Sequence, residues 1–334
     1  MPKFEINKTG IKTIAELIEN GSDKQLLKIL KDVHYADIAE IIDELPVEGA
    51  TYLIKLLDSE KTADAITEVD EDLREKILEK LSAKEIAKEI QELDTDDAAD
   101  LIAELPVERQ EKVMSQISDT EHVEDIRELL TYQENTAGGL MAKELVKVQD
   151  SLSVLKCLNA MRAQAEEVTR VHSIYVVNEK NVLKGRLSLK DLITANSRAI
   201  VKDICIPSVD FVTVDQSGEE VAEIMSKYDL EAIPVVNSKK QLMGRITIDD
   251  IVDFIKEEAE KDYQLAAGIS NDVEANDGII QLTKARLPWL FLGLLGGLGS
   301  VFILQDFEQL MEQPELRSLF FYTPLIAARS EERF

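Results

Sequence analysis

Cysteine and histidine are scarce in this chain, which has two cysteines and three histidines among 334 residues. Cys157 and Cys205 lie in apolar surroundings without metal-type spacing, so we expect small core residues in a reducing compartment. The histidines form neither an HxxxH nor an HExxH pattern, which leaves zinc-dependent catalysis without support. Because a nucleophile–base set, a phosphate-binding loop and a dinucleotide fingerprint are also missing, we expect no enzymatic activity.

Basic residues are few as well: 38 lysines and arginines stand against 65 acids, and the net charge is −27. This balance argues against nucleic acid as a partner, since phosphates need lysine and arginine. The first residues are polar and contain no apolar signal segment, so we expect the part before about residue 285 to stay in the cytoplasm. The 45% apolar content excludes wholesale disorder, and the length predicts two or three domains.

A repeat of twelve residues runs through positions 37–120. Two apolar sites three residues apart recur in every unit, which places them on one helical face. The first site holds Leu45, Leu57, Val69, Leu81, Leu93, Leu105 and Ile117, and the second holds Ile42, Ile54, Ile66, Leu78, Ile90, Ile102 and Met114. Each unit therefore predicts a short helix and a turn, and stacked pairs predict an all-α superhelical domain over residues 1–135.

The residue after each first site suits a helix start. Aspartate, serine and proline occupy this place at Pro46, Asp58, Asp70, Ser82, Asp94, Pro106 and Ser118. The pairs Ser82–Glu85 and Ser118–Glu121 fit the capping box. The acid-rich stretch from Asp94 to Asp100 has two readings, a cap with a solvated helix start or part of a metal site, and the repeat alone favours the first.

An internal duplication follows the repeat. Val176-Val177-Asn178 matches Val235-Val236-Asn237, and the segment from Gly185 to Asp191 matches that from Gly244 to Asp250, both at an offset of 59 residues. Each copy reads helix, apolar strand, turn with a glycine, strand and helix. We therefore predict two α/β domains, over residues 136–200 and 201–255.

The duplicated pattern resembles the CBS domain, and the pair resembles a Bateman module. CBS pairs are regulatory sensors, commonly of adenine nucleotides or metal ions. The resemblance implies that Ser188 and Asp191 in the first copy, and Thr247 and Asp250 in the second, hold a ribose. The alternative is that these residues only cap the helices that follow them, and the sequence does not separate the two readings.

A strongly acidic segment from Asp249 to Asp262 follows, in which seven acids face two lysines. On a helix, Asp250, Asp253, Glu257 and Glu260 share a stripe about 80° wide. Like charges at this spacing repel, so the stripe is either well solvated or neutralised by cations, and carboxylate oxygens suit Mg²⁺ or Ca²⁺. We expect a connecting helix over residues 256–284.

Residues 287–304 contain no charge and have about the minimum length that can cross a bilayer as a helix. Lys284 and Arg286 precede them and place the N-terminal side in the cytoplasm, while Trp289 suits the interface. We therefore expect an α-helical transmembrane domain over residues 285–334, with a first span at about 287–305 in the lipid bilayer. A second apolar run, residues 319–328, is too short to cross.

In this order the parts resemble the MgtE-type magnesium transporters along essentially the whole chain. The supporting motifs are Tyr132–Met141, Tyr228–Val236 and Thr247–Asp253, followed by Arg286-Leu-Pro-Trp-Leu at the span. The resemblance implies a homodimer in the cell membrane that conducts Mg²⁺, whose cytosolic part binds regulatory Mg²⁺ and closes the pore through the connecting helices. The implied ligands are Asp97, Asp100, Asp229, Asp250, Asp253, Glu258 and Asp262. The helical stripe favours Glu257 where the family match favours Glu258, and Lys261 stands where relatives tend to carry an acid.

Two further expectations follow from the resemblance. The family's pore needs five spans, so a chain that stops shortly after residue 328 is expected to hold an incomplete transmembrane domain and not to transport alone. ATP binds some relatives and is a candidate ligand here. The alternative function is therefore a membrane-anchored CBS module that senses adenine nucleotides rather than Mg²⁺.

Overall fold

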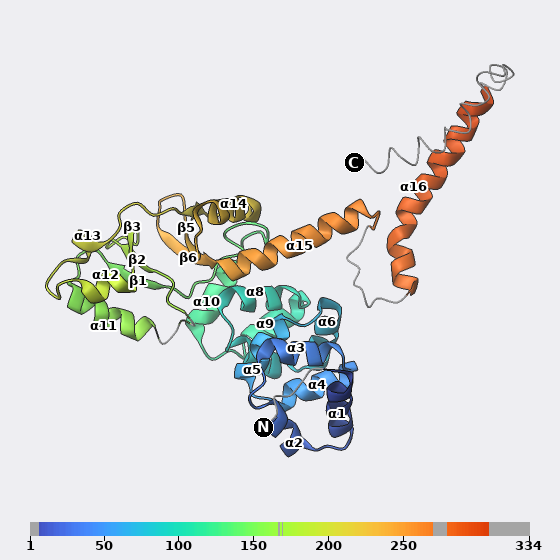
Figure 1. Ribbon diagram of the computed structural model, residues 1–334, viewed down its shortest axis with the longest axis horizontal. Coiled ribbons are helices and arrows are strands. Elements are labelled where there is room, and N and C mark those ends of the chain that lie inside the picture. The colour runs from blue at the N-terminus through green and yellow to red at the C-terminus, as the bar shows by residue number, and fades with distance from the viewer. Residues whose placement is uncertain (1–6, 166–167, 169, 270–278, 307–334) are drawn as a thin grey trace. The chain divides into compact units, whose positions relative to one another are not determined.

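Short helices and two small sheets make up the first part of the chain in the computed structural model, which describes residues 7–165, 168, 170–269 and 279–306 (Figure 1). The chain divides into two compact units, Met1–Ile251 and Val252–Phe334. The first helices are α1 (Lys8–Glu19), α2 (Asp23–Leu30), α3 (Tyr35–Asp43), α4 (Val47–Leu56), α5 (Ser59–Thr67), α6 (Glu71–Lys80), α7 (Ala83–Ile90), α8 (Thr95–Ala103), α9 (Val107–Met114) and α10 (Thr120–Leu129).

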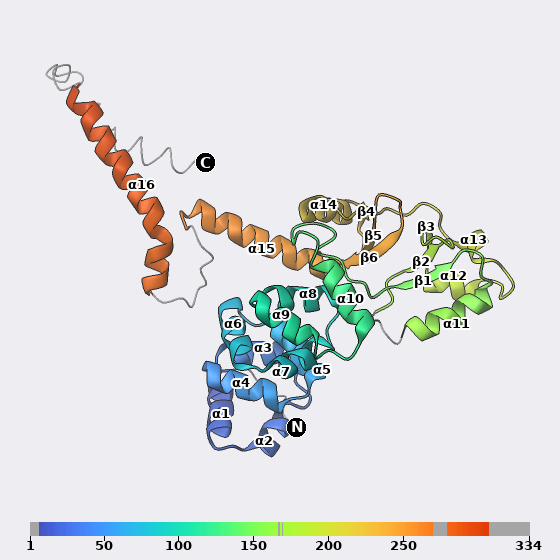
Figure 2. The ribbon, with the colours of Figure 1, turned by 180° about the vertical axis from the view of Figure 1, so that it is seen from behind.

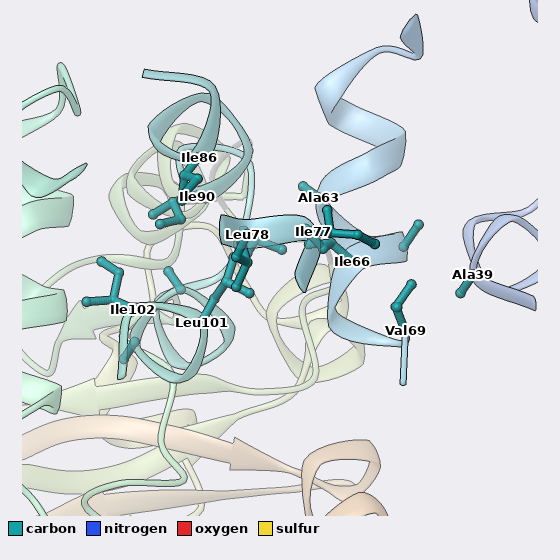
Figure 3. Close-up of a cluster of buried hydrophobic side chains, with 14 of the residues drawn as sticks. Ala39, Ala63, Ile66, Val69, Ile77, Leu78, Ile86, Ile90, Leu101 and Ile102 are labelled. Atoms are coloured by element: carbon teal, nitrogen blue, oxygen red, sulfur yellow. The ribbon is translucent and has the colours of Figure 1, made fainter. Parts of the chain in front are cut away.

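The twelve-residue repeat forms the helical stack that its spacing predicts. All fourteen apolar positions of the two repeated sites are buried, with at most 8% of any side chain exposed. Figure 3 shows Ile66, Leu78, Ile90 and Ile102 from successive helices within one apolar cluster. Each short helix thus has its apolar face covered by its neighbours, and the prediction of an all-α repeat domain is confirmed.

The predicted helix starts are confirmed except at the last repeat. Ser82 and Glu85 form the full capping box, with the Ser82 Oγ accepting from the Glu85 N–H. The predicted capping box of Ser118 and Glu121 is wrong, because α10 begins one residue later and Asp119 caps its free N–H groups. Ser118 instead donates its N–H and its hydroxyl to Gln91 Oε1, at 2.7 and 2.6 Å.

Cationic side chains close the C-terminal ends of two helices. Lys61 Nζ donates to the carbonyl oxygens of Leu30 and Val33, at 3.2 and 3.3 Å. Two 24-residue repeats further on, Arg109 Nη2 donates to the carbonyls of Leu78 and Leu81, at 3.0 and 2.7 Å. The Leu30 and Leu78 carbonyls also accept from the N–H groups of Val33 and Leu81, at 3.3 Å. The cation therefore adds a charged donor at a helix end, where carbonyls are poorly satisfied and the dipole favours positive charge.

We expect the substitution Arg109→Met to lower the free energy of unfolding by about 1.5–3 kcal/mol, because it keeps the aliphatic stem and removes two charged hydrogen bonds. Chemical denaturation measures this loss. The control is Glu108→Gln at the neighbouring exposed position, which should change stability by less than about 0.5 kcal/mol. Equal stability of Arg109→Met and the unmodified chain would contradict a stabilising role for this contact.

Two sheets of the same topology follow the helical stack. The first has the order β1 (Val146–Gln149), β2 (Ile174–Val177), β3 (Leu183–Leu187), and the second has the order β4 (Val212–Thr213), β5 (Ala232–Val236), β6 (Leu242–Thr247). In both, the first pair is parallel and the second is antiparallel, and both carry an irregularity at positions 59 residues apart, Val176/Val177 and Val235/Val236. The duplicated α/β pair is confirmed, although the short strands β1 and β4 were not predicted.

Helices cover these sheets, as both views show (Figures 1 and 2). They are α11 (Val154–Gln164), α12 (Leu189–Thr194) and α13 (Val201–Ile204) in the first copy, and α14 (Gly218–Tyr228) in the second. The tips of the two β-hairpins pair with each other, since Leu183 N–H donates to Lys240 O and Leu242 N–H donates to Asn181 O, at 3.0 and 2.9 Å. Asn181 and Lys240 both adopt a φ of +59°, so the two tips are equivalent in backbone conformation.

The hydrophobic clusters do not follow the boundaries of the domains predicted from the sequence. One continuous cluster extends from Ile14 in the helical stack through Ala137 and Met141 to Ile233 and Ile251 of the second α/β copy. The first copy has a separate core around Val146, Cys157 and Ile174. The helical domain is therefore packed as one body with the second α/β domain.

The acidic segment forms helix α15 (Ile248–Ala266), which begins directly after β6. The segment predicted as a connecting helix, residues 256–284, contains the end of α15, residues 270–278 outside the described ranges, and the start of α16 (Ile279–Asp306). Within the described part of the chain, no helix is both long and apolar enough to cross a membrane. The span expected at residues 287–305 stays a prediction, and the second apolar run, residues 319–328, lies outside the described residues.

Candidate metal centre

Acidic side chains from three segments distant in sequence come together in the first unit. Helix α8 contributes Asp94, Asp96 and Asp97 at its N-terminal end, the loop before β1 contributes Glu144, and the start of α15 contributes Asp250. We refer to these five residues as the acidic cluster. The α8 acids lie where the helix dipole favours negative charge, while Asp250 enters because β6 runs directly into α15.

Hydrogen bonds fix two of these carboxylates. Asp250 Oδ2 accepts from the Thr247 N–H at 2.9 Å and from the Thr247 hydroxyl at 2.7 Å. Glu144 Oε2 accepts from the Thr95 N–H at 3.2 Å and from its hydroxyl at 2.9 Å. Thr95 is itself buried, with 1% of its surface exposed, so the α8 start is tied to the Glu144 loop.

One arginine enters the acidic cluster from the second sheet. Arg245 on β6 has only 6% of its surface exposed, and its Nη2 lies 3.6 Å from Asp94 Oδ2. Its Nε donates to the backbone carbonyl of Glu144. The arginine therefore links the helical stack to the second α/β domain across the cluster.

The negative charges of the acidic cluster exceed the positive charge that Arg245 supplies, and the pKa values of its aspartates are raised. Burial raises the pKa of Asp94 to about 6, the charge of Glu144 adds to this rise, and Arg245 opposes it. Burial and the charges of Asp97 and Asp250 raise the pKa of Asp96 well above its usual range. Asp97 keeps solvent contact, yet loss of water and the charge of Asp250 raise its pKa too. Burial also raises the pKa of Asp250, against the two Thr247 hydrogen bonds.

The chemistry of the acidic cluster fits a hard divalent cation. Its donors are all oxygens, and Asp96 Oδ1 is buried without a hydrogen-bond partner. A buried acceptor of this kind costs free energy unless a cation or proton satisfies it. In the described residues no three histidine, cysteine or acidic side chains are arranged to hold a metal ion directly. Mg²⁺ often keeps several waters and uses only one or two carboxylates, so the donors fit an ion held partly through water.

The structure brings together only some of the predicted metal ligands. Asp97 and Asp250 belong to the acidic cluster, and Asp100, one turn further along α8, adds to the rise in the Asp97 pKa. Asp229 lies at the end of α14, exposed and in the left-handed backbone region, with φ of +50°.

The remaining predicted ligands belong to the second unit, on α15. Asp253 is paired with Lys256, with 2.6 Å between Oδ1 and Nζ. Glu258 is paired with Lys261, with 3.3 Å between Oε1 and Nζ. Asp262 is exposed in the same helix. These three residues stay predictions as ligands.

The four residues predicted to hold a ribose bond to each other in pairs, and Ser188 caps α12. Ser188 Oγ accepts from the Asp191 N–H at 3.1 Å and donates to Asp191 Oδ2 at 2.6 Å. In the second copy the Thr247 hydroxyl likewise donates to Asp250 Oδ2, which here also accepts from the Thr247 N–H. None of the four lines the cavity described next, and their part in nucleotide binding stays a prediction.

A small cavity of about 40 Å³ lies between the two α/β copies. Its polar lining comes from Ser173, Tyr175, Arg186, Ser208 and Asp210. The Tyr175 hydroxyl is buried without a hydrogen-bond partner, and burial raises its pKa to about 12 against the opposing charges of Arg245 and Arg186. An unsatisfied hydroxyl beside a guanidinium suits a small polar or anionic group.

Sequence reasoning missed several residues of both sites. Glu144 and Arg245 approach α8 only through the fold, because both are distant from it in sequence. Tyr175 lies within an apolar strand, where its polar end gives no distinct signal. A charged residue inside a strand that is otherwise apolar was the one local sign for Arg245.

Known proteins resemble this chain over most of its length. Residues 33–135 match the family model described as the MgtE intracellular N domain, and residues 137–198 and 201–257 match the CBS domain. A magnesium transporter MgtE of Thermus thermophilus is 32% identical over 328 residues, which cover 94% of this chain and 70% of that protein. One of Bacillus subtilis is 33% identical over 199 residues, or 60% of this chain and 44% of the relative.

Solved structures agree with the sequence matches. The cytosolic domain of the Mg²⁺ channel MgtE in complex with ATP is 32% identical, with a TM-score of 0.68 over 73% of this chain and 99% of that one. The soluble part of a magnesium transporter is 28% identical, with a TM-score of 0.66 over 75% of this chain and 98% of the other.

Proposed function

The chain belongs to the MgtE family of magnesium transporters, and we propose that its acidic cluster senses cytoplasmic Mg²⁺ and controls a magnesium-conducting pore. Membership of a transporter family agrees with the expectation that the chain is not an enzyme. The proposal rests on this membership and on one observation, the convergence of carboxylates from the helical domain and the second α/β domain.

The physical basis of sensing is charge repulsion. The charge of Asp97 raises the pKa of Asp96, and the charge of Asp250, at the start of α15, raises the pKa of both. A divalent cation relieves this repulsion and satisfies Asp96 Oδ1, so its binding stabilises the contact between α8 and the start of α15. When Mg²⁺ falls, the repulsion returns and loosens that contact.

The remaining parts of the proposal extend the sensor to the membrane. Asp100, Asp229, Asp253, Glu258 and Asp262 add further Mg²⁺ ligands, some of them shared in a homodimer. Helix α15 transmits the change toward a first membrane span at about residues 287–305. The protein then lies in the cell membrane as part of a multi-pass assembly, with residues before about 285 on the cytoplasmic side, and Mg²⁺ is both the regulator and the transported ion.

Mg²⁺ should protect the full chain in detergent against limited proteolysis, and the protection should saturate as the concentration rises. The physical reason is that bound Mg²⁺ stabilises the folded, closed arrangement over the opened one. Na⁺ at matched ionic strength is the control, because it screens charge without coordinating carboxylates. Absence of Mg²⁺-specific protection up to tens of millimolar would refute the sensor.

A second candidate function is the sensing of adenine nucleotides. The cavity beside Tyr175 and Arg186 is far smaller than a nucleotide, so it holds at most one small polar or anionic group of such a ligand. The structurally similar cytosolic domain described above was solved with ATP. Nucleotide binding that is unaffected by Mg²⁺, together with absent Mg²⁺ protection, would make this the leading function.

A further inference from the structure

Arg245 is a buried cation whose backbone and side chain are both fixed by neighbouring residues. It lies in the central part of β6, opposite Pro234 of β5 in the strand register. Its backbone N–H and C=O exchange hydrogen bonds with Ala142, at 2.9 and 2.8 Å. Only 7% of its side chain is exposed, so both the backbone and the guanidinium are held by the surrounding structure.

Within the described residues, the ion pair and the hydrogen bond given for the Arg245 side chain both involve residues of the acidic cluster. Nη2 faces Asp94 Oδ2 at 3.6 Å, and Nε donates to the Glu144 carbonyl. Its charge opposes the rise in pKa that burial causes at Asp94 and Asp250. A guanidinium stays charged at all physiological pH values, so this compensation is permanent.

The compensation is incomplete. The acidic cluster contains five carboxyl groups, and Asp96 Oδ1 still lacks a partner with Arg245 in place. The distance of 3.6 Å to Asp94 is also longer than a good charged hydrogen bond. Arg245 therefore neutralises only part of the negative charge of the acidic cluster. The remaining carboxylate charge is available to a second cation.

We propose that Arg245 is the resident counter-cation of the acidic cluster, which competes with Mg²⁺ and thereby sets the Mg²⁺ concentration at which the cluster responds. This inference rests on the proposed sensing function. Without Mg²⁺, Arg245 reduces the repulsion among the carboxylates but does not cancel it, so the contact between α8 and the start of α15 still loosens. When Mg²⁺ enters, the fixed positive charge repels the ion and weakens its binding. Arg245 is thus a positioning and affinity-setting residue rather than a ligand.

The test compares Arg245→Gln and Arg245→Lys in the full chain by calorimetric titration with Mg²⁺ and by thermal unfolding in a chelator. Arg245→Gln should bind Mg²⁺ about three- to tenfold more tightly, as expected from removing one charge near the ion. It should also unfold at a lower temperature without Mg²⁺, because Asp94 loses its partner. Arg245→Lys should retain the affinity of the unmodified chain, since it retains the charge.

The outcomes separate the inference from the function on which it rests. Unchanged or weaker Mg²⁺ binding by a folded Arg245→Gln variant would overturn the role of Arg245, while absent binding by the unmodified chain would overturn sensing itself. If Arg245→Gln does not fold, Arg245→Met replaces the guanidinium with a neutral, mostly apolar side chain. It should also bind Mg²⁺ more tightly than the unmodified chain, and unchanged or weaker binding by this folded variant would contradict the proposal.

Discussion

Replacing Asp97 and Asp250 together with asparagine should stabilise the protein without divalent cations and remove most of its response to Mg²⁺. The two carboxylates repel each other, so neutralising both removes an unfavourable interaction of the folded state. The same change removes the charge that attracts Mg²⁺, and we expect its apparent affinity to fall at least roughly tenfold. In the unmodified chain, Mg²⁺ at a hundred times its dissociation constant adds about 2.7 kcal/mol of stability.

Thermal unfolding over a Mg²⁺ titration measures both effects in one experiment. The matched control is Glu79→Gln with Glu124→Gln, which removes two exposed acids of the same helical domain. This control should respond to Mg²⁺ as the unmodified chain does. A double aspartate variant that keeps the full Mg²⁺ response would place the sensing ion elsewhere in the molecule.

The substitution Glu89→Gln should remove a large part of the pH dependence of stability near neutrality. Glu89 on α7 is 5% exposed, and its Oε2 accepts a 2.5 Å hydrogen bond from the hydroxyl of Thr62, which is fully buried on α5. Burial raises the pKa of Glu89 from 4.5 to about 7. Between about pH 4.5 and pH 7 the folded state therefore keeps a proton on Glu89 that the unfolded state releases. This difference in pKa corresponds to about 3 kcal/mol in the free energy of unfolding.

The sign of the effect follows from the raised pKa. The stabilisation from the bound proton is complete below about pH 4.5, falls as the pH rises, and is lost above about pH 7. Glutamine stays neutral throughout, so at pH 8 we expect Glu89→Gln to be about 1–2 kcal/mol more stable, after the cost of a buried amide with an unpaired N–H. Denaturant unfolding at several pH values checks this, and an equal stability loss at every pH would be evidence against it.

The helical domain was predictable because its information is local. Leu78 and Ile90, twelve residues apart, lie on the buried faces of adjacent helices through spacing alone, and Ser82 with Glu85 marks a helix start within four residues. Ser118 failed as a predicted cap because Asp119 beside it is an equally good cap, and the choice between them depends on the contact with Gln91 from another helix.

The candidate site was only half predictable because its partners are distant in sequence. Asp97 and Asp250 stood out through the acidic runs around them, but Glu144 and Arg245 reach α8 only after the sheets and the helical stack have packed. Likewise, nothing local distinguishes Tyr175 from an ordinary strand residue until the neighbouring copy closes the cavity over its hydroxyl.

Because the helical domain and the second α/β copy share one hydrophobic core, the order in which the ribosome makes them affects folding. The cluster that begins at Ile14 is completed by Ile233 and Ile251, while the first α/β copy, which lies between them in sequence, has its own core. A ribosome adds about 5–20 residues per second, so the apolar surface of the helical domain near Met141 stays uncovered for several seconds after that domain emerges. During this interval the nascent chain presents a binding site for chaperones, and the inserted first α/β copy can fold independently before the rest is complete.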